Sequence, residues 1–215
     1  TTNTNRYELP YMGRVWELGA MHDNGAMSLY STLTSVTESP VAEGVLYTGS
    51  DDGLIHFSGD AGQTWTRAAA LPGVPERAFI NKVEVSQHEA NTVFALADAH
   101  KVGDFTPYLF RSDDNGRSWT SIRGDLPDGT IAWAIQQDHV VPDLLVLAGE
   151  WGLYFSPNGG TNWHKLSAGA PTIAFRDVKL HRRDDDIVGA TFGRGIYILD
   201  DYSPLREIAS GALAG

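Results

Sequence analysis

A motif made of a serine, a short turn rich in Asp, Asn and Gly, and a tryptophan occurs three times in this chain. The copies span residues 58–65, 112–119 and 156–163 and read SGDAGQTW, SDDNGRSW and SPNGGTNW. Their third positions, Asp60, Asp114 and Asn158, lie 54 and then 44 residues apart (114 − 60 and 158 − 114). A period of roughly 40–50 residues is typical of four-stranded propeller blades. The motif therefore predicts a repeat architecture.

Each copy lies between short apolar and aromatic segments that are typical of β-strands. Such segments, bounded by Gly and Asp turns, predict hairpins, and one further strand-like segment precedes each hairpin. A fourth unit lacks the motif and ends in residues 204–208, which we expect to be a strand. The sequence thus predicts an all-β fold, a β-propeller of four-stranded antiparallel blades at about 31–70, 78–126, 130–170 and 172–209. Residues 1–30 are then an N-terminal extension or the remnant of a preceding blade, and 210–215 a tail.

The motif residues are expected to be structural. The Asp or Asn side chain accepts hydrogen bonds from turn amides, the Gly takes a positive φ, and the Trp buries a large apolar area. These properties explain the motif without any chemistry, so we reject a catalytic role for its acids. The residues assigned to this structural role are Ser58, Asp60, Gly62, Trp65, Ser112, Asp114, Gly116, Trp119, Ser156, Asn158, Gly160 and Trp163.

Composition excludes several classes of function. The formal charge is −11, from 16 basic and 27 acidic residues, which opposes binding to nucleic acids and anionic membranes. The absence of cysteine excludes disulfides and thiolate metal sites. No apolar stretch approaches the roughly 18 residues of a membrane span, and the chain starts without a signal-peptide pattern. The seven histidines are scattered singly, so we expect no metal site, and no motif indicates a cofactor.

The motif resembles the Asp-box, or BNR repeat, of sialidases and sortilin-type receptors. Segments 47–54, 104–111, 148–153 and 190–201 also resemble large bacterial propeller proteins described as BNR-repeat glycosyl hydrolases or sortilin-like. In that family such segments lie in the last blades of a longer propeller. The resemblance therefore implies a C-terminal portion that packs against further propeller blades, another domain or another chain, in an extracytoplasmic or secreted protein. A self-closed ring of four blades is the alternative.

The connections between second and third strands are expected to emerge opposite the motif turns, where propellers commonly bind ligands. The connection at 98–104 is longer than a hairpin needs, and unusual loops tend to carry function. We expect Trp151 to stack on a sugar or peptide and the acids to accept hydrogen bonds, although turn formation alone also explains each acid. The predicted ligand-binding face contains Asp51, Asp52, Asp98, His100, Asp104, Glu150, Trp151 and Arg194.

The leading interpretation is a non-catalytic scaffold and recognition surface for a peptide or glycan. The alternative is a glycoside hydrolase acting on an extracellular polysaccharide, which needs two carboxylates about 5–5.5 Å or 6.5–9.5 Å apart. Asp52 and Glu150 are the candidate pair, and the catalytic residues are otherwise unknown. A sialidase is disfavoured because the early Phe/Tyr-Arg-Ile-Pro signature is missing, and residues 175–177 match it only superficially.

Overall fold

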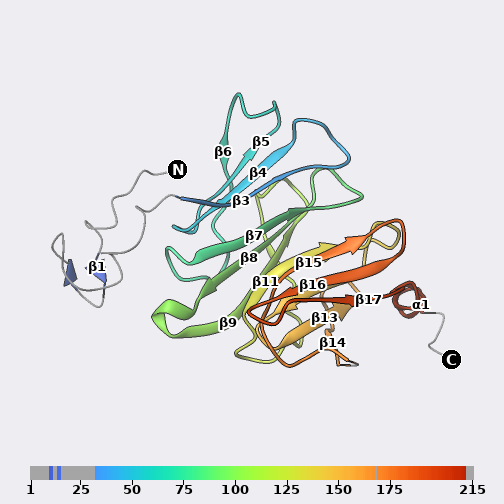
Figure 1. The fold of residues 1–215 in the computed structure, drawn as a ribbon. Coiled ribbons are helices and arrows are strands. Elements are labelled where there is room, and N and C mark those ends of the chain that lie inside the picture. Colours follow the sequence, from blue (N-terminus) through green and yellow to red (C-terminus); the bar gives the residue numbers. More distant parts are fainter. Residues whose placement is uncertain (1–9, 12–13, 16–31, 168, 212–215) are drawn as a thin grey trace.

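The computed structural model describes residues 10–11, 14–15, 32–167 and 169–211. Their regular structure is almost entirely β, in four antiparallel sheets that follow one another like the blades of a propeller (Figure 1). This arrangement confirms the predicted fold class. A separate hairpin of β1 (Pro10–Tyr11) and β2 (Arg14–Val15) precedes the sheets.

The first three blades each contain four strands that pair in chain order. Blade 1 consists of β3 (Leu33–Glu38), β4 (Leu46–Ser50), β5 (Ile55–Ser58) and β6 (Thr66–Arg67). Blade 2 consists of β7 (Phe79–Val85), β8 (Val93–Ala99), β9 (Asp104–Ser112) and β10 (Thr120–Ser121). Blade 3 consists of β11 (Ala132–Gln137), β12 (Leu145–Gly149), β13 (Gly152–Ser156) and β14 (His164–Leu166).

Blade 4 differs from the others because it has three strands. These are β15 (Phe175–His181), β16 (Asp186–Thr191) and β17 (Ile196–Leu199). The prediction of a fourth strand at 204–208 is wrong, since Pro204–Ala209 forms the short helix α1. Proline suits the first turn of a helix, where its missing N–H costs nothing, and Leu, Arg and Glu are good helix formers. No described helix has the length and apolarity needed to cross a membrane.

Three hydrophobic clusters hold the four blades together, each between two consecutive sheets. Tyr47 and Phe110 belong to the cluster between blades 1 and 2, Leu96 and Leu147 to that between blades 2 and 3, and Phe175 to that between blades 3 and 4. Blades 1 and 2 approach closely at Gly49, where an added Cβ would meet the side chains of Ile80 and Val83. Within the described residues, no cluster joins blade 4 to blade 1. The described blades therefore form an arc.

The three motif turns share one set of hydrogen bonds. In the first copy, the Ser58 hydroxyl donates to Asp60 Oδ1 over 2.8 Å and accepts from the Gly62 amide over 2.9 Å. The Asp60 carboxylate also accepts from the amide and the hydroxyl of Thr64, at 2.8 and 2.6 Å. These bonds lower the pKa of Asp60 to about 2, with the Thr64 hydroxyl making the largest contribution. The second and third copies repeat the pattern around Asp114 and Asn158.

The motif tryptophans of blades 2 and 3 fasten each blade to the one before it. Trp119 donates its indole N–H to the carbonyl of Ala69, and Trp163 donates to that of Ile122, each over 3.0 Å. Both side chains are buried, at 8% and 7% exposure. Trp65 differs from the predicted burial, because it is 42% exposed and donates within its own turn. Blade 1 is the first described blade, so Trp65 has no preceding blade to pack on among the described residues.

A buried network holds α1 against blades 3 and 4. Asp138, whose side chain has no exposed surface, accepts hydrogen bonds from Tyr202 at 2.6 Å and from Arg206 at 2.8 and 3.0 Å. Arg206 also pairs with Asp185 at 2.7 Å. Burial raises the pKa of Tyr202 above its usual range, and the adjacent Asp138 raises it further. These bonds hold α1 in place, and α1 takes the position in the chain at which the other blades have their fourth strand.

Two sequence predictions lie outside the described residues. Apart from β1 and β2, the predicted N-terminal extension at 1–30 cannot be compared with the structure. The same is true of residues 212–215 of the predicted tail.

Candidate ligand-recognition face

The second-to-third connections lie at one end of the blades, and the motif turns lie at the other. In Figure 1 the connection between β8 and β9 is at the lower left, whereas α1 is at the right. This connection includes the short 3-10 helix η3 (His100–Val102). We call the end that carries these connections the loop face and the opposite end the motif face.

Every first strand contains a β-bulge near its start, at the loop face. The pairing register shifts between Leu33 and Ser35, and at the corresponding points of the other three blades. A bulge inserts one residue and re-aims its side chain, which is why bulges are common beside functional sites. Successive first strands also contact one another, so the four inserted residues follow the inner edge of the arc. We call them the rim residues: Thr34, Asn81, Trp133 and Arg176.

Each of the first three rim residues contacts the next blade. The Thr34 hydroxyl donates to the carbonyl of Ile80 over 2.6 Å, and the Asn81 amide donates to that of Ala132 over 2.8 Å. The Trp133 ring lies under the guanidinium of Arg176, with 3.5 Å between the ring centroid and Cζ. The rim thus changes from polar to aromatic to cationic along the arc.

Trp133 is the centre of a cluster that joins three blades. Its indole N–H donates to Glu150 Oε2 over 2.9 Å, and the His100 ring lies edge-on at 6.0 Å. His100 is itself held by Asp98, whose Oδ1 lies 2.5 Å from Nδ1 and 2.7 Å from the backbone N. The structure therefore brings together three of the predicted site residues, Asp98, His100 and Glu150. We call these three with Trp133, Arg176 and Phe192 the Trp133 cluster.

Arg176 lies between two aromatic rings. Its Cζ is 3.5 Å from the Trp133 centroid and 5.2 Å from that of Phe192, distances at which a cation is attracted to a ring face. Phe192 is 69% exposed, so the stack is open to solvent. In the part of the chain that the structure describes, no carboxylate or carbonyl pairs with the Arg176 guanidinium. Its planar set of N–H donors is available to a ligand.

The remaining predicted acids are held by bonds within their own loops. Asp51 accepts from the amide of Thr32 at 3.0 Å, and buried Asp52 accepts from the Ser50 hydroxyl at 2.5 Å. Asp104 accepts from the Tyr108 hydroxyl at 2.7 Å, and this bond is the main reason that the pKa of Asp104 lies below its usual value. These contacts agree with turn formation as the role of each acid.

Trp151 and Arg194 take different positions on the loop face. Trp151 is 50% exposed, but its indole N–H donates to the carbonyl of Gly129 over 2.9 Å, across the connection that enters blade 3. Its hydrogen bond therefore anchors it beside that connection rather than to Trp133. Arg194 is exposed in the turn between β16 and β17, two residues after Phe192.

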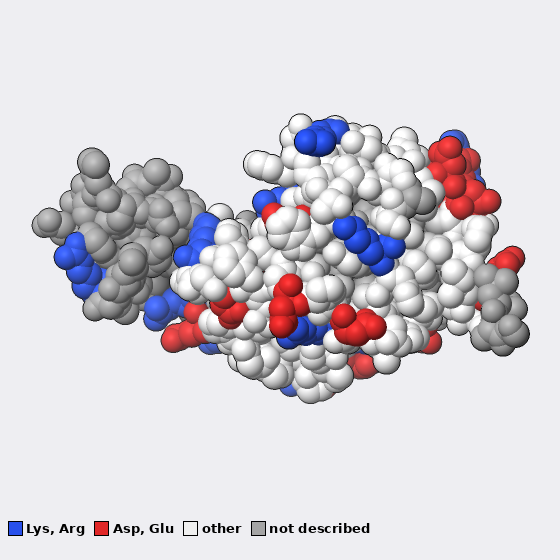
Figure 2. All heavy atoms as spheres, turned by 90° about the horizontal axis from the view of Figure 1, so that it is seen from below, with Lys and Arg blue, Asp and Glu red and all other residues white. Residues whose placement is uncertain are grey.

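The loop face combines exposed apolar side chains with cations. Figure 2 shows one side of the molecule, where acidic and basic groups, some of them side by side, lie on a largely uncharged surface. Three exposed cations of the loop face are Lys101, Arg176 and Arg194. Its exposed apolar side chains come from three consecutive blades and are Val102, Phe105, Trp151 and Phe192, each at least half exposed.

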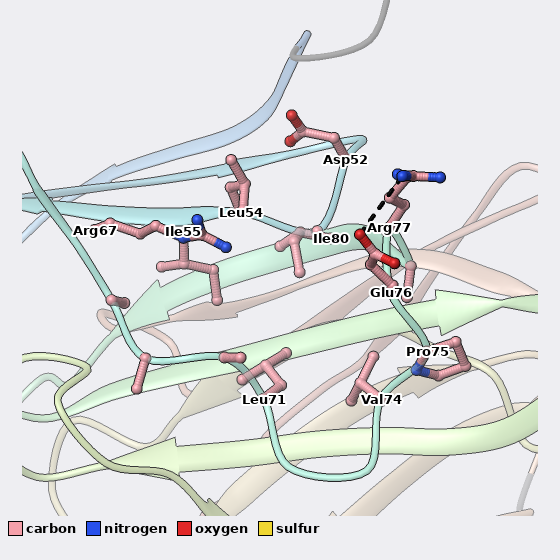
Figure 3. Close-up of a pocket in the computed structure, with 15 residues that line it drawn as sticks. Asp52, Leu54, Ile55, Arg67, Leu71, Val74, Pro75, Glu76, Arg77 and Ile80 are labelled. Atoms are coloured by element: carbon pink, nitrogen blue, oxygen red, sulfur yellow. Dashed lines mark ion pairs between the residues drawn. The ribbon is translucent and has the colours of Figure 1, made fainter. Parts of the chain in front are cut away.

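A separate cavity of about 280 Å³ lies beside blade 1. The loop that carries Leu71 and Val74 passes beside the strands that carry Ile55 and Ile80 (Figure 3). Asp52 also lines this cavity, but Glu150 does not. Glu150 is bound to Trp133 in blade 3, so the cavity does not unite the two acids suggested as a glycosidase pair.

One group of potential metal ligands occurs among the described residues, on the motif face. His181, Asp184 and Asp186 place one ligand atom each within 4.8 Å of one another. Asp184 already pairs with Arg183 at 2.8 Å, and the hydrogen bond from Arg183 lowers the pKa of Asp184. The group is largely exposed and stands at a tight turn.

No protein-family model and no curated protein sequence matches this chain. Solved structures do match. An ancestral GH74 enzyme is 19% identical with a TM-score of 0.59, over 80% of this chain and 24% of its own. The GH74 xyloglucanase of Xanthomonas campestris is 15% identical with a TM-score of 0.58, over 78% of this chain and 29% of its own. A YCF48 protein bound to D1 peptide is 17% identical with a TM-score of 0.57, over 78% and 51%.

These likenesses show the fold. Their low identities mean that they place the chain among β-propellers without deciding its activity. The chain spans about a quarter of the GH74 enzymes and about half of the YCF48 protein.

Proposed function

We propose that this chain is a non-catalytic propeller segment whose loop face recognises a peptide or a glycan. The observation that carries the proposal is the open stack of Trp133, Arg176 and Phe192 on the inner rim. Aromatic rings and a cation with free donors bind ligands without chemistry. The rim also has a rigid base, because Glu150 and the edge-on His100 hold Trp133 in place.

The state of the loop-face acids supports binding over catalysis. Asp51, Asp52, Asp98, Asp104 and Glu150 each accept a hydrogen bond from a neighbouring protein group. A glycosidase needs two carboxyl groups at a fixed separation, one acting as general acid and the other as nucleophile or general base. The observed bonds use these acids to shape loops, which favours a scaffold.

The structural neighbours support both the proposal and its alternative. The YCF48 protein is bound to D1 peptide, which supports peptide recognition by a propeller. The xyloglucanase supports the alternative of a glycoside hydrolase. We also propose that the repeated turns are Asp-boxes and that the chain is sortilin-like, because the serine and the Asp or Asn at the third position make the same bond in successive blades.

The outer faces of the arc support completion by further blades, another domain or another chain. On the face of blade 4 turned away from blade 3, Ile196 and Ile198 are 67% and 60% exposed. Val36 of blade 1 is 71% exposed. Uncovered apolar sheet faces and edges are avoided in stable proteins, so a partner is expected there. We place the protein outside the cytoplasm on the strength of the family resemblance alone.

The proposal is tested by measuring binding and hydrolysis with one preparation. Peptide and glycan arrays are probed with the wild-type chain, with Phe192→Ala and with Trp65→Ala as an exposed aromatic control on the motif face. We expect retention on an array, loss of that retention with Phe192→Ala, and no change with Trp65→Ala. Incubation with polysaccharides should release no sugar.

The opposite result identifies an enzyme. Release of reducing sugar by the wild type, abolished by Asp52→Ala and by Glu150→Ala, contradicts the proposal and supports the glycoside hydrolase.

A further inference from the structure

We infer that Arg176 is the anchor for a carboxylate of a peptide ligand, with Phe192 contacting an apolar side chain beside that carboxylate. The inference rests on the proposed function and narrows it to one class of ligand. It starts from the equivalence of the rim residues, which occupy the same bulge in four consecutive blades.

Arg176 is the rim residue whose donors remain unused. The donors of Thr34 and Asn81 go to carbonyls of the next blade, and the indole N–H of Trp133 goes to Glu150. Arg176 has no such partner in the described part of the chain. Stacking on Trp133 covers one face of the guanidinium and leaves its N–H groups directed outward in the plane of the group. A carboxylate matches that planar set of donors, because it can accept two parallel hydrogen bonds.

The surroundings favour a peptide over a glycan. The free hydrogen-bonding groups of Arg176 are all donors, and a charged carboxylate makes stronger hydrogen bonds with them than a neutral sugar hydroxyl does. Phe192, which is 69% exposed and lies 5.2 Å from Arg176 Cζ, adds an apolar surface beside these donors, and Phe105 and Val102 on the same face are 52% and 68% exposed. Such side chains complement the Leu, Ile or Phe side chains of a peptide.

Charge favours an isolated carboxylate over a polyanion. The chain carries a formal charge of −11, which repels long acidic polymers, whereas the Arg176 guanidinium offers one local cation with free N–H donors at the rim. A peptide with one or two acidic residues next to an apolar residue gains the local attraction and avoids most of the general repulsion. The ligand class is therefore an acidic, apolar peptide segment.

The experiment uses an array of 12-residue peptides in which each Asp or Glu has a matched Asn or Gln version. Binding of the wild-type chain is compared with Arg176→Gln and Arg176→Lys. The matched control is Arg117→Gln, which removes an arginine that is also exposed, from the motif face. Tryptophan fluorescence and thermal melting of each variant verify that the fold is kept.

We expect the wild type to prefer acidic peptides over their amide versions by about 10-fold, the size expected for a charge-assisted bidentate contact. Arg176→Gln should remove this preference, Arg176→Lys should restore part of it, and Arg117→Gln should leave it intact. Peptide binding that ignores the acid-to-amide change overturns the inference while the proposed function stands. Binding of glycans alone also overturns it. Binding of neither class rejects the proposed function itself.

Discussion

The replacement Arg206→Ala tests whether buried charge holds the last helix in place. In the wild type, Asp138 has no exposed side-chain surface and receives five hydrogen bonds, two from Arg206, one from Tyr202 and one each from the amides of Val140 and Val141. The variant removes the guanidinium and leaves a carboxylate buried without its cation. The network also loses the pair between Arg206 and Asp185.

The magnitude follows from the pKa of Asp138. Burial raises this pKa, but the hydrogen bonds from Arg206 and Tyr202, together with those from two backbone amides, outweigh burial and bring it from 3.8 to about 2. At about 1.4 kcal/mol per pKa unit, the native contacts of the carboxylate contribute about 2 kcal/mol at neutral pH. Removing one partner of a buried ion pair costs roughly 3–5 kcal/mol. We therefore expect Arg206→Ala to lower the free energy of unfolding by about 2–5 kcal/mol.

Urea unfolding at pH 7 measures this loss, with Arg183→Ala as the matched control. The Arg183 side chain is 82% exposed and pairs with Asp184 at the surface, so its removal should cost far less stability than that of Arg206. Equal losses in the two variants would refute the reasoning, because they would mean that the buried pair is no stronger than the exposed one.

The same pair of variants gives a pH test. The pKa of Asp138 is lower in the folded than in the unfolded chain, so its stabilisation is complete above about pH 4 and disappears as pH falls through about 2. The deficit of Arg206→Ala relative to the wild type should accordingly shrink between pH 4 and 2. A deficit that is independent of pH across this range would exclude Asp138 as its source.

Three further predictions concern how consecutive blades are joined. Gly124→Ala should lower the free energy of unfolding in urea by at least about 2 kcal/mol, because the added Cβ would lie 2.4 Å from two carbonyl oxygens of the third motif. The control Gly73→Ala has open space around the added Cβ and should cost about 1 kcal/mol. Trp163→Phe should cost about 1–3 kcal/mol of stability, because it leaves the buried carbonyl of Ile122 without a hydrogen bond. Trp65→Phe should cost less, because that indole donates within its own turn. Equal melting temperatures of the two variants would contradict the role of Trp163 in joining blades 2 and 3. Asp114→Ala should lower the melting temperature at pH 7. The pKa of Asp114 is lowered to about 2, chiefly by the hydroxyl of Ser118, so the difference in melting temperature between variant and wild type should become smaller towards pH 2.

The repeat made the fold predictable. Serine, acid, glycine and tryptophan at fixed offsets specify one turn, and the strands on either side follow from alternating apolar residues. Residues 204–208 were predicted to be a strand but form a helix. A short segment of Leu, Arg, Glu and Ile shows neither the alternation of a strand nor the periodicity of a helix, and Pro204 is compatible with a strand edge or a helix start. The helix is decided by contacts of Arg206 with residues distant in sequence, which no local pattern reveals.

The candidate site was only partly predictable. The loops that carry Asp98, His100 and Glu150 were found from topology, but Trp133 and Arg176 were not, because a bulge breaks the alternation that marks which side chains leave the core. Comparing the first strands of successive blades would have offered a signal, since Trp133 and Arg176 stand at equivalent positions. Trp151 was expected to be a stacking platform from its exposed loop, and that role stays a prediction.

The central claim is that the loop face binds a ligand at the Trp133 cluster. Hydrogen–deuterium exchange of the chain, with and without the best-retained array peptide, tests it most directly. We predict slower exchange in residues 98–105, 131–134, 174–176 and 192–196. Protection confined to the motif turns or to the cavity lining at 67–78 would contradict it.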